Sequence, residues 1–149
     1  MHEVSGEISF YAGPRDCVQP EEDSKTMRIL IADDQPSVRS AIRLLLDQQP
    51  ERHSFAEVAD AQELLDGVTN RCFDVVLLDW ELPGTAPGNL VARLRALCPD
   101  VFTVILDTKP QTRQLAFRAG AGGFVCKNDP PECLLAAVNR PMLGDHTDK

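Results

Sequence analysis

The sequence lacks the marks of several classes of protein. It has no CxxC pair, and its cysteines, which are odd in number, lie far apart as Cys17, Cys72, Cys98, Cys126 and Cys133. This pattern predicts neither a disulfide framework nor a zinc site. No apolar run approaches the roughly 18 residues that span a bilayer, and the start MHEVSGEISF lacks the basic and apolar regions of a signal peptide. We therefore expect a cytoplasmic protein with reduced thiols.

Basic charge is also scarce. The chain has 15 Lys and Arg against 23 Asp and Glu, which gives a formal net charge of -8. Proteins that bind nucleic acid directly usually carry a basic stripe that neutralises phosphates. We therefore expect no direct nucleic-acid partner, and no membrane partner. The length of 149 residues fits one domain with a sizeable core.

The chain divides into three parts. Residues 1–26 are rich in glycine, proline and the polar run QPEEDSK, so we expect a flexible N-terminal extension, although ISFYAG could add a short strand. Residues 27–140 form the predicted domain, and residues 141–149 form a C-terminal tail. Within the domain we predict strands at 28–32, 55–59, 73–79, 101–106 and 123–126, and helices at 37–49, 61–68, 89–97, 111–120 and 131–138.

This alternation of strands and helices predicts an α/β fold. Parallel strands need right-handed crossover helices, and those helices cover both faces of the sheet, so the architecture is a doubly wound five-stranded parallel sheet sandwiched by five helices. In such folds the functional crevice lies beyond the carboxyl ends of the strands, where the strand order reverses. Residues that follow the strands are therefore the candidates for chemistry.

Acidic residues follow two of these strands. RILIA runs directly into Asp33 and Asp34, and FDVVLLD ends on Asp79. Three carboxylates brought close together cannot all stay ionised without a compensating cation. Oxygen ligands with an open side suit Mg²⁺. Lys127 follows the fifth strand and should bring a positive charge to the same edge.

Each of these residues also has an ordinary explanation. An aspartate at a strand end often caps a helix or lies in a loop, and Lys127 alone could be a solvated surface charge. Phe124 alone would be a core residue. Trp80, next to Asp79, is either a half-exposed packing residue or a fluorescence reporter of the site. The ordinary explanations weaken when the charged positions are taken together, because all of them fall at the expected strand ends.

The joint pattern resembles the receiver (REC) domain of bacterial two-component response regulators. Asp34 and Asp79 are 45 residues apart, and Asp79 and Lys127 are 48 apart. Pro83 lies four residues after Asp79, and RAGAGGF precedes the lysine. The segment KNDPPECLLAAV is most similar to receivers of the LuxR/FixJ-type class, which normally precede a DNA-binding domain. The resemblance covers residues 27–140, and the chain ends about nine residues later, so we expect a stand-alone receiver.

The resemblance implies a CheY-like, flavodoxin-like sheet with strand order 2-1-3-4-5 and a magnesium-dependent phosphoacceptor rather than an enzyme. It assigns the phosphoacceptor role to Asp79 and pairing with the phosphate to Lys127. It makes Asp34 a direct Mg²⁺ ligand, with Asp33 acting through water or a hydrogen bond. The remaining assignments are the backbone carbonyl of Glu81 as a further ligand and Phe124 as the switch aromatic.

The implied partners are proteins. A histidine kinase or a phosphotransfer protein would supply the phosphoryl group, and the receiver would signal through contacts with a downstream protein that the sequence does not identify. A homodimer is one arrangement that receivers adopt.

One position departs from the family pattern. Receivers end their fourth strand with a serine or threonine whose hydroxyl contacts the phosphoryl group, but in VFTVILDTKP this position holds Asp107, and Thr108 comes one residue later. Because strand side chains alternate, only one of the two can face the site. If Asp107 does, its charge should raise the cost of phosphorylation. The loops after Asp79 and after Asp107 also differ in length from the usual pattern.

Two alternatives stay open. The first is an atypical receiver-like binding module that acts independently of phosphorylation, which Asp107 and the altered loops favour. The second is a flavodoxin-like cofactor binder or a phosphohydrolase. The turn DDQPS lacks the glycine and hydroxyl residues that hold a flavin phosphate, and neither DDQ nor DWE supplies the DxD motif of dehalogenase-type phosphatases.

Overall fold

The computed structural model describes residues 26–141. Its strands are β1 (Arg28–Ala32), β2 (Ser54–Val58), β3 (Val75–Asp79), β4 (Phe102–Asp107) and β5 (Gly123–Cys126). Its helices are α1 (Pro36–Asp47), α2 (Ala61–Asn70), α3 (Pro87–Leu97), α4 (Thr112–Ala119) and α5 (Pro131–Asn139). None of these helices is long and apolar enough to cross a bilayer. The predicted N-terminal extension, the ISFYAG strand and the C-terminal tail lie outside the described residues.

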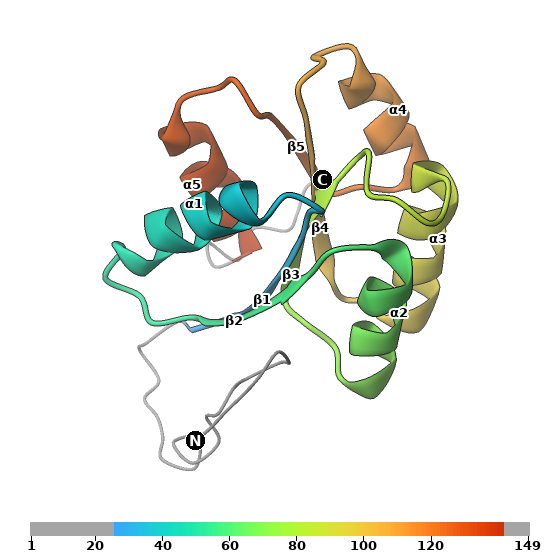
Figure 1. Cartoon of the computed structure of the whole chain (residues 1–149), viewed down its shortest axis with the longest axis horizontal. Helices are drawn as coiled ribbons and strands as arrows, with labels where there is room; N and C mark the ends of the chain where they lie inside the picture. Colours follow the sequence, from blue (N-terminus) through green and yellow to red (C-terminus); the bar gives the residue numbers. More distant parts are fainter. Residues whose placement is uncertain (1–25, 142–149) are drawn as a thin grey trace.

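The five strands form one parallel sheet with the order β2-β1-β3-β4-β5. Helices α1 and α5 cover one face of this sheet, and α2, α3 and α4 cover the other (Figure 1). The predicted α/β fold and strand order are thus confirmed. The order reverses between β1 and β3, so the carboxyl ends of these two strands border the crevice in which doubly wound folds place their sites.

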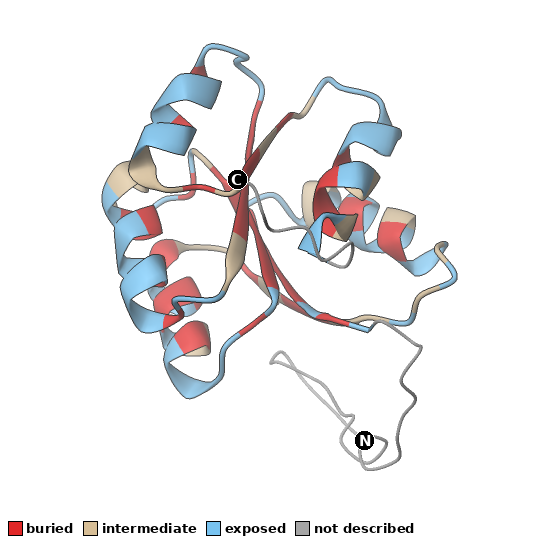
Figure 2. Ribbon diagram, turned by 180° about the vertical axis from the view of Figure 1, so that it is seen from behind, coloured by how far each residue is buried: buried red, intermediate tan, exposed pale blue. Residues whose placement is uncertain are grey.

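Continuous apolar runs form the central strands because both faces of the sheet are covered. All five residues of β3 are buried, and four of the five in β1 are buried, so the middle of the sheet is a closed core (Figure 2). Alternate side chains enter different cores: Leu30 and Leu78 pack with α2 and α3, whereas Ile31 and Leu77 pack with α1. This burial fixes the depth at which the charged residues after the strands emerge.

Local signals place several helix ends. Pro36 and Pro87 begin α1 and α3, where the missing N–H of proline costs nothing. The side chain of Asp60 accepts a hydrogen bond from Glu63 N at the start of α2. Gly120 ends α4 with a φ of 111°, in the left-handed region that favours glycine. Helix α3 begins two residues earlier than the predicted 89–97, because Pro87 starts the helix.

The prediction that no disulfide forms is wrong for the described cysteines. Cys72 and Cys98 form a disulfide with their Cα atoms 5.8 Å apart, while Cys126 and Cys133 are free. Cys72 lies shortly before β3 and Cys98 caps the end of α3, so the chain passes up the sheet and returns along the helix between them. A separation of 26 residues hides this proximity in the sequence.

Reduction of this disulfide should lower the free energy of unfolding by about 3 kcal/mol, because the cross-link joins residues 26 positions apart and so restricts the unfolded chain. Urea unfolding with and without a phosphine reductant measures the effect. In Cys72→Ala the reductant should have no effect, and equal stabilities of the oxidised and reduced wild type would contradict the prediction.

Thr103 of β4 offers a second test of the core. Its side chain is buried, and Oγ1 has no hydrogen-bond partner among the described residues. A buried hydroxyl without a partner costs free energy, so Thr103→Val should raise the free energy of unfolding by about 1 kcal/mol. Urea unfolding checks this value, and a loss of stability would show that the hydroxyl is satisfied.

Candidate functional site

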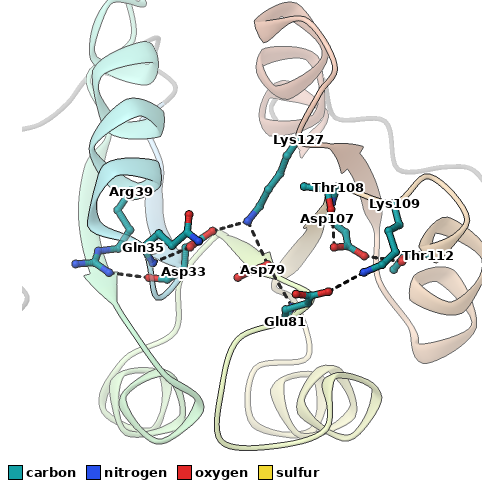
Figure 3. Close-up of polar contacts among 10 residues, drawn as sticks. All are labelled: Asp33, Gln35, Arg39, Asp79, Glu81, Asp107, Thr108, Lys109, Thr112 and Lys127. Atoms are coloured by element: carbon teal, nitrogen blue, oxygen red, sulfur yellow. Dashed lines mark hydrogen bonds and ion pairs between the residues drawn. The ribbon is translucent and has the colours of Figure 1, made fainter.

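Side chains from three strand ends meet at the carboxyl edge of the sheet (Figure 3). Asp33 follows β1, Asp79 ends β3 and Lys127 follows β5. The Nζ atom of Lys127 lies 2.9 Å from Asp33 Oδ2 and 3.2 Å from Asp79 Oδ1. We call these three residues and Asp34 the carboxylate–lysine cluster. The parallel sheet brings its members together across up to 94 residues of sequence.

Asp33 is held firmly in this cluster. Asp33 is fully buried, and its Oδ1 accepts a hydrogen bond from Gln35 N at 2.9 Å. Its backbone carbonyl accepts another from Arg39 Nη1 at 2.7 Å. With Oδ2 bound to Lys127, both carboxylate oxygens have donors. A buried carboxylate needs such donors, because burial without them carries a large penalty.

Asp79 is buried as well, with 5% of its surface exposed. Burial raises the pKa of its carboxyl, and the neighbouring charge of Asp33 raises it further. The N–H of Glu81, which donates to Asp79 Oδ1 at 3.2 Å, and the ammonium of Lys127 oppose this shift only in part. Burial is thus the main reason that the ionised form of Asp79 is disfavoured.

Lys127 responds to the same surroundings. Burial alone would lower the pKa of its ammonium, but the hydrogen bond to Asp33 and the charges of Asp79 and Asp33 outweigh it, so the pKa is raised. Lys127 is thus charged at neutral pH. Its side chain is 23% exposed and reaches the carboxylates from the solvent side.

The cluster also fits a divalent cation. Asp33, Asp34 and Asp79 each offer a carboxylate oxygen, and these oxygens lie within 4.8 Å of one another. Asp34 is exposed, so the group has a side open to solvent and water ligands. Clustered carboxylate oxygens with an open side match the requirements of Mg²⁺. Glu81, whose backbone carbonyl is the further predicted ligand, lies two residues after Asp79 in the same loop.

The two residues at the atypical position are placed differently from each other. Asp107 is the last residue of β4 and is buried, whereas Thr108 is exposed. Asp107 Oδ1 accepts a hydrogen bond from Thr108 N at 2.9 Å, and Oδ2 accepts one from Thr112 Oγ1 at 2.5 Å. The strand end is not shifted by one residue, so Thr108 does not take the place that Asp107 occupies.

Two aromatic residues flank the site. Phe124 of β5 and Trp80 are both partly buried and pack against the core under α2, α3 and α4. Trp80 N donates to Leu106 O at 2.9 Å, which joins the loop after β3 to β4. Trp80 therefore lies next to Asp79 in a partly exposed position that suits a fluorescence reporter.

Sequence reasoning missed two contacts at this edge. Thr112 is the first residue of α4, and nothing in its sequence context distinguishes it from other helical residues. Lys109 Nζ lies 2.8 Å from Glu81 Oε2, and this hydrogen bond is the main reason that the pKa of Lys109 is raised. Both side chains of this pair are more than half exposed. The opposite charges of Lys109 and Glu81 gave no signal, because they lie 28 residues apart.

Comparison with known proteins identifies the class to which this fold and site belong. The family model described as "Response regulator receiver domain" matches residues 29–139, and the chain belongs to this family. The resemblance to receivers of the LuxR class is likewise confirmed, since the similar proteins include response regulators of that family.

Particular relatives can then be named. The chain is 30% identical to the oxygen regulatory protein NreC of Staphylococcus epidermidis over 122 residues, which cover 80% of this chain and 56% of that protein. It is 28% identical to the nitrate/nitrite response regulator protein NarP of Escherichia coli over 124 residues, or 82% of this chain and 58% of that protein. The chain thus spans a little over half the length of these relatives.

A solved structure agrees in shape. The two-component response regulator of the LuxR family from Aurantimonas sp. SI85-9A1 superposes with a TM-score of 0.74 at 30% identity, covering 80% of this chain and 87% of that one. The fold is therefore shared with a response regulator whose structure is known.

Removal of the lysine should destabilise the site in a pH-dependent way. Lys127→Met leaves Asp33 and Asp79 without their shared cation, so without Mg²⁺ the free energy of unfolding at pH 7 should fall by about 2–4 kcal/mol. Since the pKa of Asp79 is already raised, the native state binds a proton more readily than the unfolded chain. The deficit should therefore shrink as the pH falls through the pKa of Asp79.

Urea unfolding followed by Trp80 fluorescence at pH 5 and pH 8 measures this difference. Lys109→Met is the matched control, because it removes a lysine from an exposed ion pair and should change stability little at either pH. A deficit in Lys127→Met that does not depend on pH would contradict the electrostatic explanation.

Proposed function

We propose that this receiver accepts a phosphoryl group on Asp79 in a magnesium-dependent way and signals its state through protein contacts. The observation that carries the proposal is the position of Lys127 Nζ, within 3.2 Å of both Asp33 and Asp79. The buried carboxylate of Asp79 thus has the ammonium of Lys127 beside it. Together with Asp33 and Asp34 it also forms a group of carboxylates that suits a metal ion. Phosphoryl transfer needs in-line positioning and neutralised charge more than covalent help from the protein.

Each residue has a distinct part in this chemistry. A carboxylate oxygen of Asp79 forms a bond to phosphorus while the bond between phosphorus and the donor breaks. Asp34, Asp79 and the backbone carbonyl of Glu81 would hold Mg²⁺, with Asp33 bound through water or a hydrogen bond. The ion supplies charge neutralisation for the phosphoryl oxygens. Lys127 supplies a second positive charge, and Asp33 keeps its ammonium oriented by a hydrogen bond of 2.9 Å.

A histidine kinase or phosphotransfer protein is the expected donor. A groove of about 570 Å³ lies between α1 and the start of α5 next to Lys127. Its walls include Ala41, Leu44, Leu45 and Leu134, and Leu44 is 61% exposed. An apolar helix of a donor protein could pack here with its phosphohistidine near Asp79. We propose a cytoplasmic location because receivers typically act there.

The proposal also includes action as a stand-alone receiver, the formation of a homodimer, and a downstream protein that recognises a surface of the receiver.

The phosphoacceptor role can be tested with a small phosphodonor. Incubation with acetyl phosphate and Mg²⁺ should give an acid-labile adduct on Asp79, detected by mass spectrometry, and beryllofluoride with Mg²⁺ should change Trp80 emission. Asp79→Asn should keep the fold and lose both responses, because it removes the attacking carboxylate. Chelation of Mg²⁺ is the matched control for the wild type. An adduct on another residue, or none, would overturn the proposal.

A second function is favoured by one observation. The Asp107 carboxylate accepts hydrogen bonds from Thr112 and Thr108. The loop after β4, which a phosphoryl group would attract, is therefore already held in place by hydrogen bonds within the chain. A receiver-like module that binds its partner independently of phosphorylation would use such a fixed loop. Equal partner binding by the wild type and Asp79→Asn would favour this second function.

A further inference from the structure

Asp107 lies next to the phosphoacceptor in the sheet. The residue before it, Leu106, is the register neighbour of Asp79, and neighbouring strands are about 5 Å apart. A carboxylate directed from this position toward Asp79 would repel both the donor and the transferred phosphoryl group. An acidic residue here therefore conflicts with the proposed function unless its charge is directed elsewhere.

The structure shows where the charge is directed. Asp107 Oδ2 accepts the hydroxyl hydrogen of Thr112, which is 5% exposed and begins α4, and Oδ1 accepts the N–H of Thr108. Oδ2 thus points to a donor at the start of α4, and Oδ1 is held by the N–H of the next residue in the chain (Figure 3). This end of a helix carries a partial positive charge, which further favours a carboxylate.

The backbone of Asp107 is fixed independently of its side chain. Its carbonyl accepts a hydrogen bond from Lys127 N at 2.7 Å, and β4 pairs with β5 up to this residue. Loss of the Thr112 hydroxyl would therefore free the carboxylate to rotate without moving the strand. The carboxylate also borders a hollow of about 500 Å³ that Trp80 and Glu81 line, so there is space on the side of the acceptor loop.

We infer that Thr112 is a positioning residue of the phosphoacceptor site, whose hydroxyl holds the Asp107 carboxylate against α4 and away from Asp79. This inference rests on the proposed function and reconciles it with the acidic residue at the end of β4. Thr112 does not touch the reacting atoms; it acts through Asp107.

The variant Thr112→Val keeps the shape of the side chain and removes its donor. The freed carboxylate should slow phosphorylation of Asp79 by acetyl phosphate on the order of threefold to tenfold, because it adds negative charge near the incoming phosphoryl group. The same added charge should tighten Mg²⁺ binding, measured by Trp80 emission, by a similar factor. A general loss of structure would weaken both processes, so the opposite signs identify an electrostatic cause.

Three variants serve as controls. Thr112→Ser keeps the hydroxyl and should behave as the wild type. Asp107→Asn combined with Thr112→Val removes the charge and should restore both the rate and the Mg²⁺ affinity. Thr103→Val removes another buried hydroxyl from β4, the strand that contains Asp107. Thr103 Oγ1 has no partner among residues 26–141, so this variant should alter neither the phosphorylation rate nor the Mg²⁺ affinity.

Amide hydrogen exchange gives a measurement that needs neither phosphate nor metal. Thr108 N–H, which is bound to Asp107 Oδ1, should exchange faster in Thr112→Val and at the wild-type rate in Thr112→Ser. If the wild type forms no adduct, the proposed function fails, while exchange and Mg²⁺ affinity still decide the role of Thr112. Unchanged exchange, parallel changes in rate and affinity, or failure of Asp107→Asn to restore them would overturn the inference.

Discussion

The concentration of negative charge at one edge of the sheet is the constraint on which the rest of this structure depends. Asp33 and Asp79 are both buried, and burial of carboxylates is costly unless donors and cations compensate them. Lys127 binds both, and backbone N–H groups of the adjoining loops bind one oxygen of each. The raised pKa of Asp79 shows that burial and Asp33 still outweigh this compensation. The remaining imbalance is what a metal ion would relieve.

The sheet makes this arrangement possible because its strands are apolar and parallel. A strand that is buried on both faces can only end in polar residues where it leaves the core, and parallel strands leave the core at the same edge. The charge cluster is therefore a direct result of the register between β1, β3, β4 and β5. The helices contribute less to the chemistry than to the burial of the strands that end in Asp33 and Asp79.

Sequence reasoning could predict the features that depend on pattern and topology. The apolar runs predicted the strands, and the topology predicted that Asp33, Asp79 and Lys127 would meet. It could not predict the Cys72–Cys98 disulfide or the contact of Thr112 with Asp107, because these depend on where a helix end lies relative to a strand. Such positions follow from packing, which has no periodic signal in the sequence.

The contacts that join β4 and its following loop to their neighbours differ in strength. This difference decides which of them would break first if charge were added at Asp79. The bond from Thr112 Oγ1 to Asp107 is buried, so breaking it would leave polar groups without partners. The pair of Lys109 and Glu81 joins the loops after β4 and β3 on the exposed surface, where an ion pair contributes little. Charge added at Asp79 would therefore displace the exposed pair first and leave the start of α4 in place.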